Sequence, residues 1–157
     1  HLWCVVFKEI GKPFVKNFFG TGIVDIKGWL LQHSSLTLIG HNILNADLEV
    51  FRRLLGIGFT VGPDTLGGQP CTFIDTFTMS KRNNPDRLPA YIYDAKLQKK
   101  VSLGVHSLDA WGKRCGQAKM KVTDWSTQPI EIYLERCTGD VQINELAYNM
   151  MLEERDR

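Results

Sequence analysis

The sequence contains no long hydrophobic run, and its charges of opposite sign nearly balance. Its 157 residues include 19 Lys and Arg against 17 Asp and Glu, which gives a formal net charge of +2. No apolar stretch approaches the roughly 20 residues of a membrane-spanning helix, and the first residues lack the segments of a signal peptide. We therefore expect a cytoplasmic protein without a membrane partner. The small net charge neither indicates nor excludes nucleic-acid binding, because local patches matter more than the total.

Cysteine is scarce and widely spaced, and the chain has no internal repeat or low-complexity segment. No two cysteines have the close spacing of a zinc site or a redox motif. We expect four reduced and mostly buried thiols. The length fits one domain with a sizeable core, residues 1–157. The four cysteines are Cys4, Cys71, Cys115 and Cys137.

Apolar periodicity and turn residues predict an alternation of strands and helices. Strands are expected at 2–7, 14–19, 36–39 and 71–74, the first two forming a hairpin. Helices are expected at 25–32, 46–55, 76–82, 107–114 and 130–153. Loops are expected at 58–70, 82–100 and 119–128. This order predicts an α/β fold in which helices cover both faces of a mixed sheet.

Two acids that are far apart in the sequence both fall on predicted helices. Asp47 opens a helix just after the strand that ends at Gly40-His41-Asn42, and Asp140 lies on the last helix between apolar positions. Carboxylates on rigid elements are suited to hold the hard cations of a metal-dependent phosphodiesterase. The alternatives are ordinary: Asp47 also suits the helix dipole, and Asn42 also suits a turn.

Four segments, in this order and spacing, resemble the proofreading 3′–5′ exonucleases. One of them is similar to a stretch typical of phage family A DNA polymerases of the T7 type. The segments are Gly40-His41-Asn42 with Asp47, Phe73-Ile74-Asp75-Thr76 with Ser80, Gly104-Val105-His106-Ser107-Leu108-Asp109-Ala110-Trp111-Gly112, and Cys137-Thr138-Gly139-Asp140-Val141-Gln142.

The resemblance implies a ribonuclease H-like fold that removes nucleotides from the 3′ end of single-stranded DNA with two Mg²⁺ or Mn²⁺ ions. Asp47 and Asp140 match two of the family's four metal-binding, catalytic acids. Arg136 stands where one branch of the family has a catalytic Tyr; it can contact a phosphate, but it cannot accept a proton at neutral pH. A DNA polymerase module and a phage-infected bacterial host are further implications.

The resemblance also implies four substrate-binding residues, each of which has a structural alternative. They are His41, Asn42, Asp75 and His106. The two histidines equally suit hydrogen-bonded structural positions, and Asp75 followed by Thr76 reads as an ordinary helix cap. Basic residues between Lys81 and Lys121, with Tyr91 and Tyr93, suit either a solvated surface or a loop that follows a DNA strand.

The family's first motif, an Asp-x-Glu pair on the central strand of the sheet, is absent. It belongs before His1, and no nearby residues replace it. We expect that a strand carrying this pair was removed, lies outside this sequence, or comes from another chain. The competing hypotheses are an exonuclease-like module that binds single-stranded DNA or a protein without cleaving, and a purely structural domain.

Overall fold

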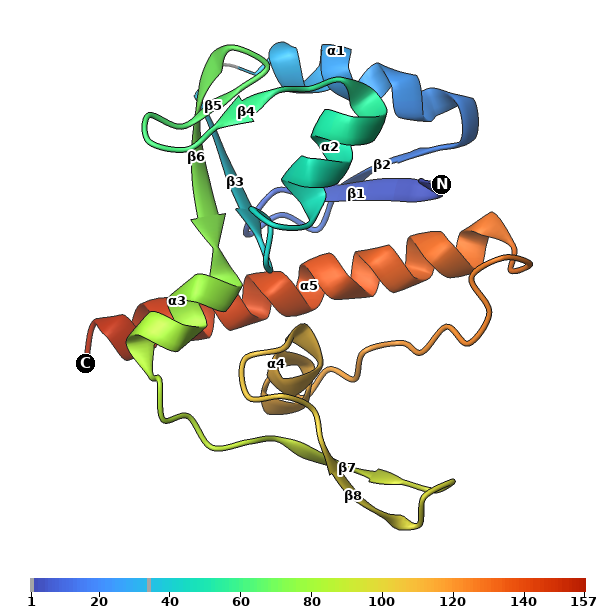
Figure 1. Ribbon diagram of the computed structural model, residues 1–157, viewed down its shortest axis with the longest axis vertical. Helices are drawn as coiled ribbons and strands as arrows, with labels where there is room; N and C mark the ends of the chain where they lie inside the picture. The colour runs from blue at the N-terminus through green and yellow to red at the C-terminus, as the bar shows by residue number, and fades with distance from the viewer. Residues whose placement is uncertain (1, 34) are drawn as a thin grey trace.

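A long C-terminal helix, α5 (Ile130–Arg155), crosses the molecule, and the other elements pack on two sides of it (Figure 1). The computed structural model describes residues 2–33 and 35–157. Helix α5 begins at residue 130, as the sequence predicted, directly after Pro129, whose fixed φ suits a helix start. None of the helices within these ranges is long and apolar enough to cross a membrane.

The N-terminal hairpin and its helices lie on one side of α5. β1 (Cys4–Lys8) pairs with β2 (Val15–Phe19) in antiparallel register, with Cys4 opposite Phe19. A 3₁₀ helix, η1 (Gly20–Asp25), leads into α1 (Ile26–Leu31). The hairpin and α1 were both predicted, because their apolar periodicity is local.

A mixed four-stranded sheet lies beside this hairpin. Its strands are β3 (Leu36–Gly40), β4 (Phe59–Thr60), β5 (Thr65–Leu66) and β6 (Gln69–Asp75), in the order β3-β6-β5-β4. β3 and β6 are parallel, and the crossover between them contains α2 (Asp47–Leu55). Gly56 ends α2 with φ +61°, a left-handed conformation that glycine adopts without strain. The fold is therefore α/β with a mixed sheet and flanking helices, as predicted.

The remaining elements follow β6 on the other side of α5. They are α3 (Thr76–Asn83), β7 (Tyr91–Asp94), β8 (Lys99–Ser102) and α4 (Leu108–Arg114). The β7–β8 hairpin extends away from the rest of the molecule (Figure 1). Ser107 caps α4 by accepting a hydrogen bond from the backbone N–H of Ala110 at 3.2 Å.

Two of the predicted loops contain strands. The segment 58–70 holds β4, β5 and the start of β6, and the segment 82–100 holds β7 and the start of β8. β4 and β5 have two residues each, which is too short for any periodicity to register. β7 and β8 carry mostly polar or exposed side chains, so the apolar alternation that marks a half-buried strand is missing.

Two buried clusters hold these layers together. The larger joins the N-terminal hairpin, α1, α2 and the sheet, and it includes Phe18, Ile26, Leu48 and Leu66. The smaller lies between α4 and α5, where the fully buried Trp111 packs against residues of α5. Because α5 contacts β1 as well as α3 and α4, this helix connects the two halves.

Candidate functional site

Asp47 lies where the turn after β3 enters α2. Asn42 adopts φ +60°, and its carbonyl accepts the backbone N–H of Ala46 at 3.0 Å, which closes the turn just before Asp47. The Asp47 side chain is accessible to solvent, but protein atoms crowd around it. This desolvation raises its pKa, and the charges of Asp75 and Asp140 raise the pKa further. The fold thus brings the two predicted metal-binding acids within electrostatic range of each other.

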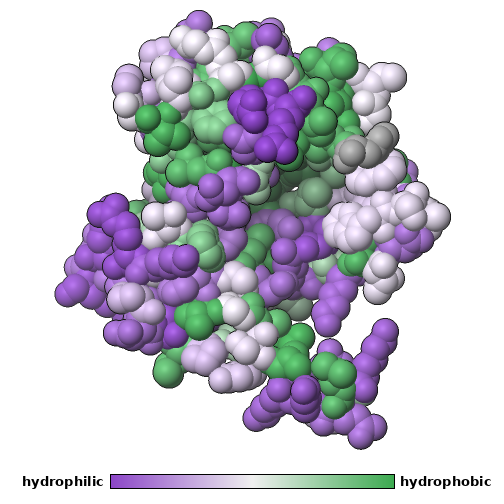
Figure 2. Space-filling model, in the orientation of Figure 1, coloured by the Kyte–Doolittle hydropathy of each residue, from purple (hydrophilic) through white to green (hydrophobic). Residues whose placement is uncertain are grey.

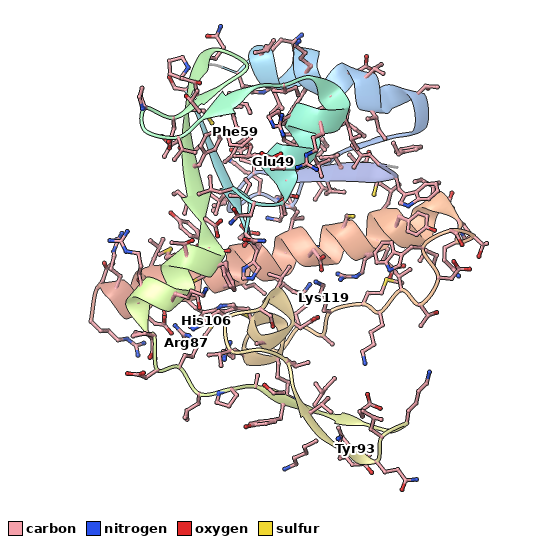
Figure 3. All side chains as sticks on the ribbon, in the orientation of Figure 1. Glu49, Phe59, Arg87, Tyr93, His106 and Lys119 are labelled. Carbon is pink, nitrogen blue, oxygen red and sulfur yellow. The ribbon has the colours of Figure 1, made fainter. Side chains whose placement is uncertain are left out.

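Asp140 lies near the middle of α5 and is held by two cations. Arg136, one turn earlier, forms an ion pair with one carboxylate oxygen, and Lys119 Nζ lies 3.6 Å from the other. Lys119 reaches this point from the segment that follows α4 (Figure 3). Burial nevertheless raises the pKa of Asp140, because desolvation outweighs the attraction of both cations. A divalent cation would compete with Arg136 and Lys119 for this carboxylate.

Asp75 organises the loop that carries Asp47. Its Oδ1 accepts the backbone N–H groups of Phe77 at 2.9 Å and Thr78 at 3.2 Å, which caps α3. The same oxygen accepts the N–H of Asn42 at 3.1 Å, and Oδ2 accepts that of Leu44 at 3.5 Å. One carboxylate therefore joins the end of β6 to the turn after β3. These contacts support the structural alternative for Asp75.

His41 belongs to a buried polar network that the sequence did not predict. Its Nδ1 lies 3.1 Å from Oγ1 of Thr76, and that hydroxyl donates to Oδ1 of Asn144 at 2.6 Å. Asn144 in turn donates to the carbonyl of Ile39 at 3.2 Å. Burial lowers the pKa of His41 to about 4, so the ring is neutral at pH 7. The sequence signal that was missed is the amide of Asn144, one turn after Asp140 on the same helix.

His106 lies close to His41 but has a different set of partners. Its Nδ1 is 2.9 Å from Oγ of the buried Ser80, which also accepts the indole N–H of Trp111 at 3.1 Å. The ring of Phe77 contacts both histidines edge-on, at centroid distances of 5.5 and 6.4 Å. Burial and the charges of nearby cations lower the pKa of His106. Two of the predicted substrate-binding side chains thus flank one aromatic ring.

The acids alone supply too few ligands for a metal centre. Within residues 2–33 and 35–157, no group of three or more His, Cys, Asp or Glu side chains could hold a metal ion. Asp47 and Asp140 would give a hard cation two carboxylates, whereas Mg²⁺ prefers six oxygen ligands. The fit to a two-metal site is therefore partial.

A groove of about 790 Å³ lies between β1 and β3, close to these acids. In the part of the chain that the structure describes, β1 pairs only with β2, and β3 pairs only with β6. The groove therefore separates one edge of β1 from one edge of β3, and each edge has room to pair with one more strand. Apolar side chains form most of the groove's lining, with charged side chains such as Lys8 and Glu145 among them. The α5 residues that line it include Val141, the residue after Asp140. On the β3 side it reaches Ile39, which leads into the turn that carries Asp47.

The two exposed tyrosines, which suit either a solvated surface or a loop that follows a DNA strand, lie apart from the acids. Tyr91 and Tyr93 are both exposed on β7, and Tyr93 lies far out on the projecting hairpin (Figure 3). Figure 2 shows hydrophilic and hydrophobic side chains side by side on this hairpin, apart from the main body. Lys119 is the predicted basic residue that pairs directly with one of the acids.

Comparison of the chain with protein-family models, with curated proteins and with solved structures gives no match.

Proposed function

We propose that this chain forms most of a 3′–5′ DNA exonuclease domain with a ribonuclease H-like fold. The observation that carries the proposal is the convergence of Asp47 on α2 with Asp140 on α5, which is close enough for the charge of Asp140 to raise the pKa of Asp47. The four sequence segments that resemble the proofreading exonucleases support the same pairing. The mixed sheet with flanking helices is compatible with the proposed fold.

The chemistry would be phosphodiester hydrolysis at a 3′ terminus. Mg²⁺ or Mn²⁺ held by Asp47 and Asp140 would supply stabilisation of the attacking and leaving oxygens. Arg136 would bind a phosphate oxygen once a divalent cation takes its place beside Asp140, since its guanidinium pairs with that carboxylate in the present structure. Lys119, only loosely paired with Asp140, would neutralise the same phosphate. His41, neutral at pH 7, can donate a hydrogen bond but does not add charge.

The groove between β1 and β3 would accept the strand that carries the missing Asp-x-Glu pair. A strand in this position would pair with both open edges and join the two sheets into one. Its alternate side chains would meet the apolar lining. Its end near Val141 and Ile39 would bring two more carboxylates toward Asp47 and Asp140, which would complete the four acids that the family uses.

The decisive experiment adds this strand to the chain. One variant carries a designed strand of alternating apolar residues with an Asp-Val-Glu triplet, joined before the N-terminus by a glycine-containing turn. Its matched control carries Asn-Val-Gln instead. We expect the acidic variant alone to shorten a 3′-labelled single strand stepwise in Mg²⁺ or Mn²⁺. The activity should disappear in Asp47→Asn and in Asp140→Asn. A folded acidic variant without activity in either metal contradicts the proposal, as does activity that survives both substitutions.

A second candidate function is single-stranded DNA binding without cleavage, alone or beside a polymerase module. The ion pairs of Asp140 with Arg136 and Lys119 favour it, because they already satisfy the carboxylate without a metal. This function predicts binding in a metal chelator that weakens steeply with salt. Lys119→Ala should reduce both the affinity and the salt dependence, and the DNA should stay at full length under every condition.

A further inference from the structure

Two cysteines from opposite ends of the sequence meet beside the candidate site. Cys4 begins β1 and Cys137 lies on α5, and their sulfur atoms are 3.5 Å apart. Both thiols are free. β1 and α5 pack directly against each other, so the backbones that carry the two thiols are held close together. The 133-residue separation explains why their spacing in the sequence gave no sign of a pair.

The two thiols differ in exposure and in protonation. Cys4 is buried, whereas Cys137 is half-buried and within reach of a small reagent. Cys4 donates its hydrogen to the sulfur of Cys137, which raises the pKa of Cys4 and lowers that of Cys137. The charge of Arg136 also lowers the pKa of Cys137, against the opposing effect of Asp140 and Asp47. Cys137 is therefore the thiol that is suited to attack first.

We propose that Cys4 and Cys137 are a reversible oxidation site that forms an intramolecular disulfide with a small disulfide, such as glutathione disulfide, as the oxidant. The Cys137 thiolate attacks one sulfur of the oxidant, forms a mixed disulfide and releases one glutathione thiolate. The Cys4 thiolate then attacks the Cys137 sulfur and releases the second. The protein loses two electrons and two protons, and these reduce the glutathione disulfide to two glutathione thiols.

The geometry makes closure of this bond a small movement. A disulfide has a sulfur–sulfur length of about 2.05 Å, so the two atoms must approach by roughly 1.5 Å. Side-chain rotation and a slight shift of β1 toward α5 can supply this. Since Cys137 lies one turn before Asp140, and β1 forms one wall of the groove, the bond would fix two parts of the candidate site. This consequence rests on the proposed function, whereas formation of the bond does not.

The test measures free thiols in the whole chain at equilibrium with glutathione buffers of graded ratio. Alkylation followed by intact mass spectrometry counts the thiols and detects bound glutathione. We expect the wild type to lose two of its four alkylatable thiols together, with no retained glutathione, and to regain them in reductant. Cys4→Ser and Cys137→Ser should lose this two-thiol transition, and Cys137→Ser should capture no glutathione at Cys4, which is buried.

Cys115→Ser is the matched control, because Cys115 is equally half-buried but has the sulfur of Met150, not a thiol, as its neighbour at 3.6 Å. It should oxidise as the wild type does. Oxidised wild type should also melt several degrees higher than the reduced form, since the bond constrains a long loop in the unfolded chain. A wild type that keeps four thiols, or takes up glutathione without closing the bond, overturns the proposal. DNA shortening measured in both redox states tests the consequence separately.

Discussion

Asn144 is the residue whose replacement best measures how much the buried polar network contributes to the free energy of unfolding. It is 9 % exposed, and its amide connects α5 to the end of β3 and to the start of α3. The carbonyl oxygen accepts from Thr76 at 2.6 Å, and the amide nitrogen donates to Ile39 at 3.2 Å. Asn144→Ala deletes both bonds and leaves the backbone of α5 unchanged.

The expected cost follows from what each partner loses. The Thr76 hydroxyl keeps a second acceptor, the carbonyl of Gly40 at 3.3 Å, so its lost bond costs about 1 kcal/mol. The Ile39 carbonyl loses its side-chain donor in a half-buried position, which costs roughly 1–3 kcal/mol. We therefore expect Asn144→Ala to lower the free energy of unfolding by roughly 2–4 kcal/mol.

Urea denaturation followed by circular dichroism measures this difference, with an unchanged m-value as the sign that only stability has shifted. Asn149→Ala is the matched control, since it removes an exposed amide from the same helix. It should change stability by no more than about 0.5 kcal/mol. Equal effects of the two substitutions would refute the reasoning, because the network would then contribute nothing beyond an exposed amide.

Three further outcomes follow from the structure. Gly112→Ala should lower the free energy of unfolding by about 1–3 kcal/mol in urea denaturation, because a Cβ there would lie 2.6 Å from the carbonyl oxygen of Gln117. A Cβ at Gly139 would meet nothing within 4 Å, so Gly139→Ala should raise the free energy of unfolding by about 1 kcal/mol. The opposite order of the two effects would contradict the packing. Asp47→Asn should raise the free energy of unfolding at neutral pH, because the raised pKa of Asp47 means that the folded state disfavours its ionised form. The gain should shrink as the pH falls toward the ordinary Asp pKa of 3.8. A gain that does not depend on pH would exclude this cause. If the acids bind a cation, saturating Mn²⁺ should raise the melting temperature of the strand-extended variant, and Asp140→Asn should abolish the shift.

The sequence by itself determined the elements whose signals are local. Gly56 ends α2, Ser107 caps α4 and Pro129 precedes α5, each within one residue of a helix boundary that the sequence predicted. These predictions succeeded because a cap or a fixed φ acts within one helical turn. The β7–β8 hairpin was missed because it stands away from the core and needs no apolar face.

Only the tertiary structure decided which distant residues share one place. Asp47, Asp75 and Asp140 were each visible in the sequence, but the charges of Asp75 and Asp140 reach Asp47 only because α5 crosses near the end of β6 and the start of α2 (Figure 1). The position of Asn144 one turn after Asp140 did not reveal its partners, and the spacing of Cys4 and Cys137 gave no sign that they pair. Contacts between residues so far apart in the chain depend on how whole elements pack, and no local pattern of residue types records that packing.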